Sequence, residues 1–122
     1  KYGDTALHDA ASKGRTETVK TLLDNLTPGQ QLKLLLTQNT HGDTAVHVSA
    51  SRGHTETVIS LLNNLRPEQQ VKLLSVKNKK GNTASQRAVG NYRTDTITAL
   101  EQYKIEADIK VFRKFVSLIN NF

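Results

Sequence analysis

Four histidines are the side chains of this 122-residue sequence best suited to metal binding or acid–base chemistry. A zinc site on a helix typically takes two histidines at positions i and i+4, which lie on one helical face. His8, His41, His47 and His54 contain no pair at that spacing, and no acidic cluster accompanies them. The sequence also has no cysteine, which excludes thiolate nucleophiles and cysteine-ligated metals. We therefore expect no metal site and no cofactor.

The sequence likewise gives no support for nucleophilic or acid–base catalysis. No serine lies in the G-x-S-x-G pattern of a strand-to-helix elbow, and no glycine-rich phosphate loop is present. Asp9 follows His8 directly, but neighbouring side chains of a helix do not face each other. Asp4 and Asp43 recur in successive turns, where we interpret them as capping residues. We expect no enzyme and no small-molecule substrate.

Composition favours a single folded domain that binds other molecules. Hydrophobic residues make up 36% and charged residues 23% of the chain, as in a folded soluble domain. The longest apolar run, Leu34 to Leu36, is far shorter than a membrane-spanning helix requires. The absence of a charged-then-apolar leader predicts an intracellular protein, cytoplasmic or nuclear. Since the sequence does not begin with methionine, we expect it to be a fragment of a longer chain.

Internal repetition organises the chain. The segment G-D-T-A at residues 3–6 returns at 42–45, and G-N-T-A follows at 81–84, so the period is 39 residues. Residues 3–41 and 42–80 are identical at 23 of 39 positions. A third copy, about 81–104, keeps the opening and then diverges. We predict two strong units and a degraded one, followed by an amphipathic helix over about 105–121 that caps the end of the stack or docks a partner.

Each unit has the pattern of short helices joined by tight turns. Thr5 can cap a first helix that ends near Gly14. A second helix carries apolar residues at the i, i+3, i+4 and i+7 positions from Val19, which form one stripe. Pro28 and Pro67 each begin a third short helix. One unit cannot bury its stripe alone, so neighbouring units must stack, and the polar turns between them must project.

This pattern resembles the ankyrin repeat, whose signature is T-P-L-H-x-A followed by a second helix with V-x-x-L-L. Here the signature stands as T-A-L-H-D-A at residues 5–10 and T-A-V-H-V-S at 44–49. The resemblance implies an all-α helical solenoid, with an extra proline-led helix that lengthens each unit. In the third copy Ser85, Gln86 and Tyr92 replace the usual Leu, His and Gly. The resemblance further implies that His8 and His47 are structural, with each imidazole hydrogen-bonded to nearby loop backbone.

The ankyrin resemblance also implies the function: a non-catalytic scaffold that binds another protein. In such stacks the turn tips and the exposed faces of the first helices line up into a concave binding surface. Carried over by the repeat pattern, that surface holds Lys1, Tyr2, Asp4, Ser12, Lys13, Thr40, His41, Asp43, Val48, Ser51, Arg52, Lys79, Lys80, Asn82, Arg87 and Asn91. The residues at one shared register, Asp9, Val48 and Arg87, differ in charge and size. Such variation is expected of a surface that sets specificity, and it would equally arise by drift on a solvated face.

Positive charge suggests what the partner is like. The formal net charge is +6, and Lys77, Lys79 and Lys80 crowd one turn, with Arg87 expected just behind it. Such a patch favours an acidic segment of a partner protein. Two alternatives remain open: binding of nucleic acid or another polyanion through the basic turn Lys77–Lys80, and a purely structural spacer between domains. Base-stacking aromatic residues are scarce, which makes nucleic acid the less favoured partner.

Overall fold

The computed structural model describes residues 2–121, so the predicted contributions of Lys1 and Phe122 lie outside it. Within this range the chain is all-α, with no strand. The helices are α1 (Ala6–Ser12), α2 (Thr16–Asp24), α3 (Pro28–Leu36), α4 (Ala45–Ser51), α5 (Thr55–Leu62), α6 (Pro67–Leu74), α7 (Ala84–Gly90) and α8 (Thr94–Asn120).

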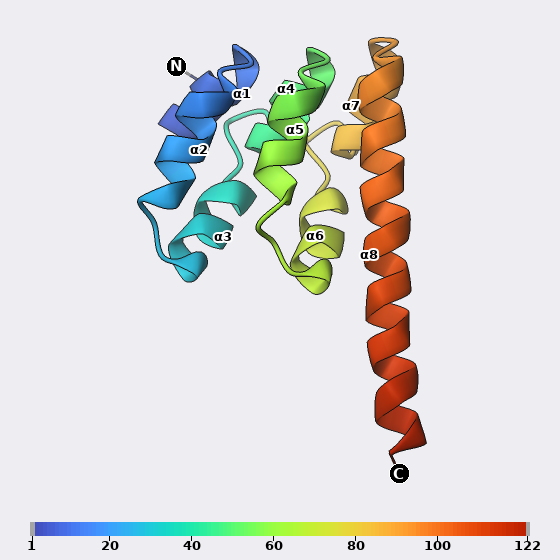
Figure 1. Cartoon of the computed structure of the whole chain (residues 1–122). Helices are drawn as coiled ribbons and strands as arrows, with labels where there is room; N and C mark the ends of the chain where they lie inside the picture. Colours follow the sequence, from blue (N-terminus) through green and yellow to red (C-terminus); the bar gives the residue numbers. More distant parts are fainter. Residues whose placement is uncertain (1, 122) are drawn as a thin grey trace.

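The helices stack in rows that run across the repeats (Figure 1). The first helices α1, α4 and α7 pack in sequence, as do the second helices α2, α5 and α8. The proline-led helices α3 and α6 contact each other and form a third, shorter row. This arrangement confirms the predicted all-α repeat solenoid, and it places equivalent residues of successive units side by side.

Threonine caps start the first helix of each unit and the third helix of the first unit. The Thr5 hydroxyl accepts a hydrogen bond from the backbone N–H of His8, and Thr44 and Thr83 cap α4 and α7 in the same way. At α3, Thr27 accepts from the N–H of Gln30, whose side chain accepts from the Thr27 N–H in return. Such reciprocal caps satisfy two backbone donors that a helix start otherwise leaves open.

The core lies between repeats, where the predicted stripes meet. Val19 and Val58 are fully buried, and so are Leu61 and Leu62. Hydroxyl pairs continue this contact at its edge: Thr16 and Thr57 lie 2.8 Å apart, and Thr55 and Thr96 lie 2.7 Å apart. Each unit therefore buries its apolar stripe against its neighbour, which is why the stack is needed for stability.

The third unit differs from the expected pattern, because α8 is one continuous helix of 27 residues and not two. In the first two units the second helix ends a few residues before a proline, which disfavours helical backbone at the residue before it and so prevents one continuous helix. Glu106 stands where Pro28 and Pro67 stand in those units, so the third unit has no such stop. The segment predicted as a separate capping helix over 105–121 instead continues the axis of α8 past the stack.

Only the first half of α8 buries side chains against the stack. Leu100 and Ala107 are buried, and the Tyr103 hydroxyl donates a 2.5 Å hydrogen bond to Asn63. Beyond Ala107 every side chain of the helix is exposed or half-buried. No helix among residues 2–121 combines the length and the apolar character needed to cross a membrane.

Candidate interaction surface

Two buried asparagines shape the turns between units. The Asn39 side-chain oxygen accepts hydrogen bonds from the backbone N–H groups of His41 and Asp43, at 2.9 and 3.0 Å. Asn78 holds Lys80 and Asn82 in the same way. Each turn is thereby fixed from inside, so its tip residues keep their positions without support from a partner.

Backbone hydrogen bonds connect successive turn tips. The N–H of Thr40 donates to the carbonyl of Tyr2 at 2.8 Å, and the N–H of Lys79 donates to that of His41 at 3.0 Å. This close approach explains the glycine at position 42, which has a φ of 78°. A Cβ atom there would lie 2.6 Å from the Lys79 backbone nitrogen. The turn tips therefore form one connected row.

The two signature histidines tie each first helix to the following turn. His8 Nε2 lies 2.8 Å from the carbonyl oxygen of Asp43, and His47 Nε2 lies 2.9 Å from that of Asn82. Because the Nδ1 atom of each ring accepts from a cap threonine N–H, Nε2 is the donor to the carbonyl. The structural role expected for both residues is confirmed. Burial lowers the pKa of His47, which favours the neutral ring that this geometry requires.

Asp43 and Arg87 form an ion pair that the sequence did not reveal. Arg87 Nη1 lies 2.9 Å from Asp43 Oδ2, and the Asn78 amide donates to Asp43 Oδ1 at 3.0 Å. The other Arg87 nitrogen, Nη2, donates to the Ser51 hydroxyl at 2.8 Å. Asp43 is therefore not a helix cap, since Thr44 fills that role. Arg87 is likewise not a free cation behind the basic turn, because Asp43 neutralises it.

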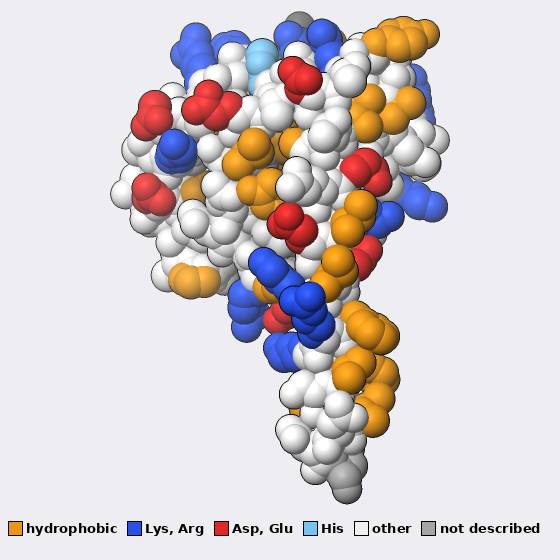
Figure 2. Space-filling model, turned by 45° about the vertical axis from the view of Figure 1, so that its right-hand side comes forward, with side chains coloured by type: hydrophobic (Ala, Val, Ile, Leu, Met, Phe, Trp, Pro, Cys, Tyr) orange, Lys and Arg blue, Asp and Glu red, His pale blue; other side chains and the backbone are white. Residues whose placement is uncertain are grey.

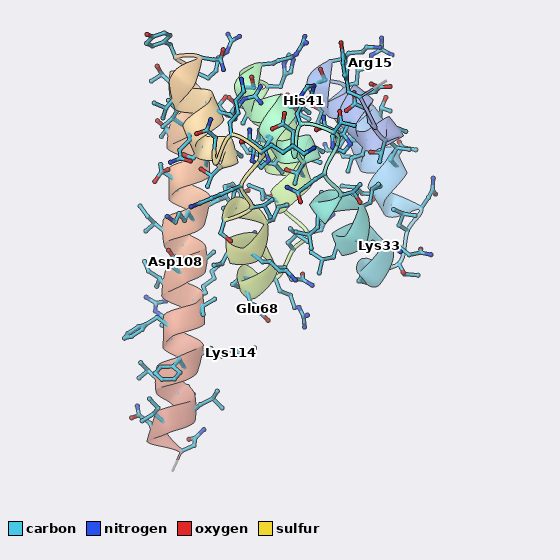
Figure 3. All side chains as sticks on the ribbon, turned by 180° about the vertical axis from the view of Figure 1, so that it is seen from behind. Arg15, Lys33, His41, Glu68, Asp108 and Lys114 are labelled. Atoms are coloured by element: carbon cyan, nitrogen blue, oxygen red, sulfur yellow. The ribbon has the colours of Figure 1, made fainter. Side chains whose placement is uncertain are left out.

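Seven of the predicted surface residues converge on one hollow, which we call the polar hollow. It has a volume of about 550 Å³ and spans the second and third units. Its predicted members are His41, Asp43, Lys79, Lys80, Asn82 and Arg87, together with Asn91. Asn78, Gln86 and Gly90 also line it and were missed, although the recurrence of Asn39 as Asn78 marks the turn. Figure 3 views the molecule from this side, with His41 labelled on its turn.

The remaining predicted surface residues lie outside the hollow. The rings of Tyr2 and His41 are 5.2 Å apart, so Tyr2 continues the row of tips. Asp4 accepts a hydrogen bond from the Asn39 amide, and Ser51 supports Arg87. The others that the hollow leaves out range from half-buried to exposed: Ser12, Lys13, Thr40, Val48 and Arg52.

The predicted basic turn is divided between two surfaces. Lys79 and Lys80 line the polar hollow, whereas Lys77 lines a separate groove between α6, α7 and α8. Lys79 and Lys80 are exposed, and neither side chain joins an ion pair within residues 2–121. The hollow therefore has two lysine ammonium groups that are available to a ligand. Its third cation, Arg87, is already paired with Asp43.

Comparison with known proteins agrees with this architecture. Residues 7–62 match the family model described as ankyrin repeats (many copies). No curated protein matched the sequence closely enough to count as a relative. Ankyrin repeats are generally modules of protein–protein interaction and are typically not enzymes. Among residues 2–121 no three histidine or acidic side chains are grouped so that they could hold a metal ion. Residues 7–62 therefore match ankyrin repeats, in units of 39 residues that each carry an extra proline-led helix.

Proposed function

We propose that the polar hollow and the row of turn tips bind a partner protein through an acidic segment. The observation that carries this proposal is the pair of exposed lysines, Lys79 and Lys80, on one wall of a hollow built from two units. His41 and Asn91 also line the hollow and add hydrogen-bonding groups to it. An extended acidic peptide would meet both the charge and the polar groups that this site presents.

Rigidity supports the same role. Buried Asn39 and Asn78 hold the turn backbones, and Arg87 is held by Asp43 and Ser51. A surface that is already ordered loses little conformational freedom when a partner binds. The site acts by recognition alone, and the interaction scaffold carries no chemical step.

The division of the basic turn favours a protein over nucleic acid. A polyanion backbone is best followed by a continuous stripe of cations. Here Lys77 is directed to a different groove from Lys79 and Lys80, and Arg87 is neutralised. Two open lysines match a short acidic segment better than a nucleic-acid strand.

A charge-reversal pair tests the proposal. Lys79→Glu with Lys80→Glu is compared with Lys33→Glu with Lys72→Glu, which changes the net charge equally on α3 and α6. Nuclease-treated lysate proteins are captured on each variant and on the unchanged chain. We expect proteins that bind the unchanged chain and the control to be lost from Lys79→Glu/Lys80→Glu. Equal capture by both variants would move the site elsewhere.

The nucleic-acid alternative has its own readout. Binding of a fluorescent single-stranded oligonucleotide is measured over a range of salt concentrations. Tight binding that falls steeply with salt, and that only Lys79→Glu/Lys80→Glu abolishes, would replace the protein partner by a polyanion. We expect weak binding that is equally reduced by both variants, because it then depends on net charge alone.

A further inference from the structure

The outer side of α8 carries an exposed apolar stripe with no partner in the repeat stack. Ile105, Ile109, Phe112 and Ile119 are between 43% and 65% exposed. Together with half-buried Val116 they follow one another at intervals of four, three, four and three residues. This is the spacing of the a and d positions of a helix-pairing heptad. We call the five residues the α8 seam.

The α8 seam is directed away from the chain's own repeats. Successive residues of a helix turn by about 100°, so Ile105 lies on the side opposite Ala107, which is buried against the stack. A shallow, mainly apolar groove between Ile97 and Ile105 extends the same face toward the start of α8. Figure 2 shows hydrophobic side chains along this edge and down the part of α8 that passes beyond the stack.

A further repeat is not the natural occupant of this face. The face that the third unit turns outward has Ser85 and Glu101 at positions whose counterparts in earlier units, such as Val46 and Leu62, are fully buried. Ser85 donates a 2.6 Å hydrogen bond to Glu101. This polar end is typical of the terminal unit of a stack. We therefore expect the α8 seam to be covered by a helix that pairs along α8 itself.

Charge along the helix identifies that helix as a second copy. Glu106 and Arg113 flank the seam on the same side, seven residues apart, and both are exposed. When two copies of α8 pair antiparallel, with Ile109 opposite Phe112, Glu106 of each copy faces Arg113 of the other. A parallel pair would set Asp108 opposite Arg113, but it would also set Glu101 opposite Glu106, two like charges that the antiparallel pair avoids. Flanking charges of this kind set the orientation of paired helices.

We propose that the chain forms a homodimer through antiparallel pairing of the α8 seam. In this register Ile105 also meets Val116, so four of the seam residues pair with another seam residue. The two stacks lie on opposite outer sides of the helix pair, because each is bound to the far side of its own α8. Both polar hollows remain open, so the dimer is independent of the proposed binding function.

The extent of the seam sets the strength of the dimer. Fifteen residues span only about 21 Å, or roughly two heptads, whereas stable coiled coils sustain at least three to four. A standard interface covers about 800 Å² on each partner, so the whole outer face of α8 must contribute. We therefore expect a reversible, concentration-dependent dimer.

Sedimentation equilibrium of the full 122-residue chain, from micromolar to millimolar concentration, tests the proposal. Phe112→Ala removes a side chain that fills two central layers of the pair, and it should raise the dimer dissociation constant at least tenfold. Val89→Ala is the matched control, since Val89 is 54% exposed on α7 outside the seam. It should leave dimerisation unchanged. Circular dichroism verifies that both variants keep their helices.

A charge exchange tests the orientation. Glu106→Arg and Arg113→Glu, each alone, place like charges opposite each other and should raise the dissociation constant several-fold. The double variant restores both pairs and should restore the dimer. In a parallel pair Glu106→Arg would instead meet Glu101 and strengthen association, which would overturn the proposal.

A chain that stays monomeric at every concentration would also overturn the proposal. The monomer is then mixed with phosphatidylserine vesicles, because a helix with an apolar face and nearby lysines can lie on an anionic membrane. Vesicle binding that Phe112→Ala abolishes would assign the seam to a membrane surface in place of a second copy.

Discussion

Arg87 and Asp43 form the ion pair that joins the third unit to the second, with Arg87 Nη1 lying 2.9 Å from Asp43 Oδ2. Asp43 is buried, and its two carboxylate oxygens are satisfied by Arg87 and by the amide of Asn78. Arg87, which the sequence predicts as a positive charge on this surface, therefore also makes a structural contact between the two units. Stability and surface charge are coupled at this position.

Replacing Arg87 should destabilise the fold. Arg87→Ala leaves the Asp43 carboxylate buried without a countercharge, which we expect to cost about 1–3 kcal/mol in the free energy of unfolding. Arg52→Ala is the control, because Arg52 is exposed and its side chain makes no hydrogen bond or ion pair within residues 2–121. Urea titration of both variants gives the difference. An equal, near-zero effect would contradict the structural role of the pair.

Equivalent leucines of the first and second units should differ in their contribution. Leu61 is 1% exposed, between two neighbouring units, whereas Leu22 in the first unit is only partly buried. Leu61→Ala should cost about 2–5 kcal/mol, because it leaves a cavity between repeats. Leu22→Ala should cost clearly less, because part of its side chain is already in contact with water. Thermal or urea unfolding compares them, and equal costs would refute this account of the core.

His47 should make stability depend on pH. Burial lowers its pKa below the ordinary 6.5, and the positive charge of Arg87 acts in the same direction. The unfolded chain then binds the proton more readily than the folded chain does. The contribution of His47 is therefore fully present above about pH 6.5 and is lost as pH falls, by at most about 1.4 kcal/mol per pH unit.

The control for this pH effect is the variant His47→Gln. Gln86 takes the corresponding place in α7, where its side chain accepts from the Thr83 N–H at 2.8 Å. His47→Gln keeps this capping function and removes the titrating ring. Urea unfolding between pH 7.5 and 5 should show a smaller loss of stability for His47→Gln than for the unchanged chain. Identical pH profiles would show that His47 does not carry the effect.

Tyr92 should be a site where a smaller residue stabilises the chain. It has a φ of 58°, at the position where Gly14 and Gly53 have 67° and 74°. This left-handed conformation costs a residue with a Cβ roughly 1–2 kcal/mol, and the Tyr92 side chain is 90% exposed, so little contact is lost on removal. Part of the gain is offset by the greater freedom of glycine in the unfolded chain. Tyr92→Gly should raise the unfolding free energy by about 0.5–1 kcal/mol.

Gly53→Ala, which adds a side chain at the equivalent position of the preceding unit, is the control for Tyr92→Gly. A Cβ atom at Gly53 would lie 2.8 Å from Cδ of Arg93, which packs over it. Gly53→Ala therefore combines a contact that must shift with the left-handed strain, and it should destabilise the chain. Differential scanning calorimetry of both variants gives the two signs. A destabilised Tyr92→Gly would mean that the tyrosine side chain has a stabilising contact.

Repetition made most of the fold predictable. A 39-residue period, threonine caps and apolar stripes each repeat, so two units predict the same helices twice. The continuous α8 was not predicted, because the prediction rested on the residues that the third unit shares with the earlier units and not on the one that it lacks. The signal for a continuous helix is the absence of a proline at position 106, where the sequence has a glutamate. Without that proline nothing in the sequence bends the chain between the second and third helical segments.

The candidate site was predictable only as a set of positions. The repeat pattern placed His41, Lys79 and Lys80 on one surface, because their turns occupy equivalent places. The pairing of Asp43 with Arg87 depends on two side chains 44 residues apart that meet across the contact between units. Such a contact follows from the offset between neighbouring units, which spacing along the sequence does not define.

The row of turn tips affects how the sequence of this surface can evolve. The tips are joined through the carbonyl oxygens of Tyr2 and His41, and every residue type has a carbonyl oxygen. The corresponding tip of the third unit is Lys80, so three equivalent positions already carry an aromatic ring, an imidazole and an ammonium group. Mutations at these positions can alter partner choice while the links between units persist. Recognition in this chain is therefore able to evolve largely apart from the architecture that displays it.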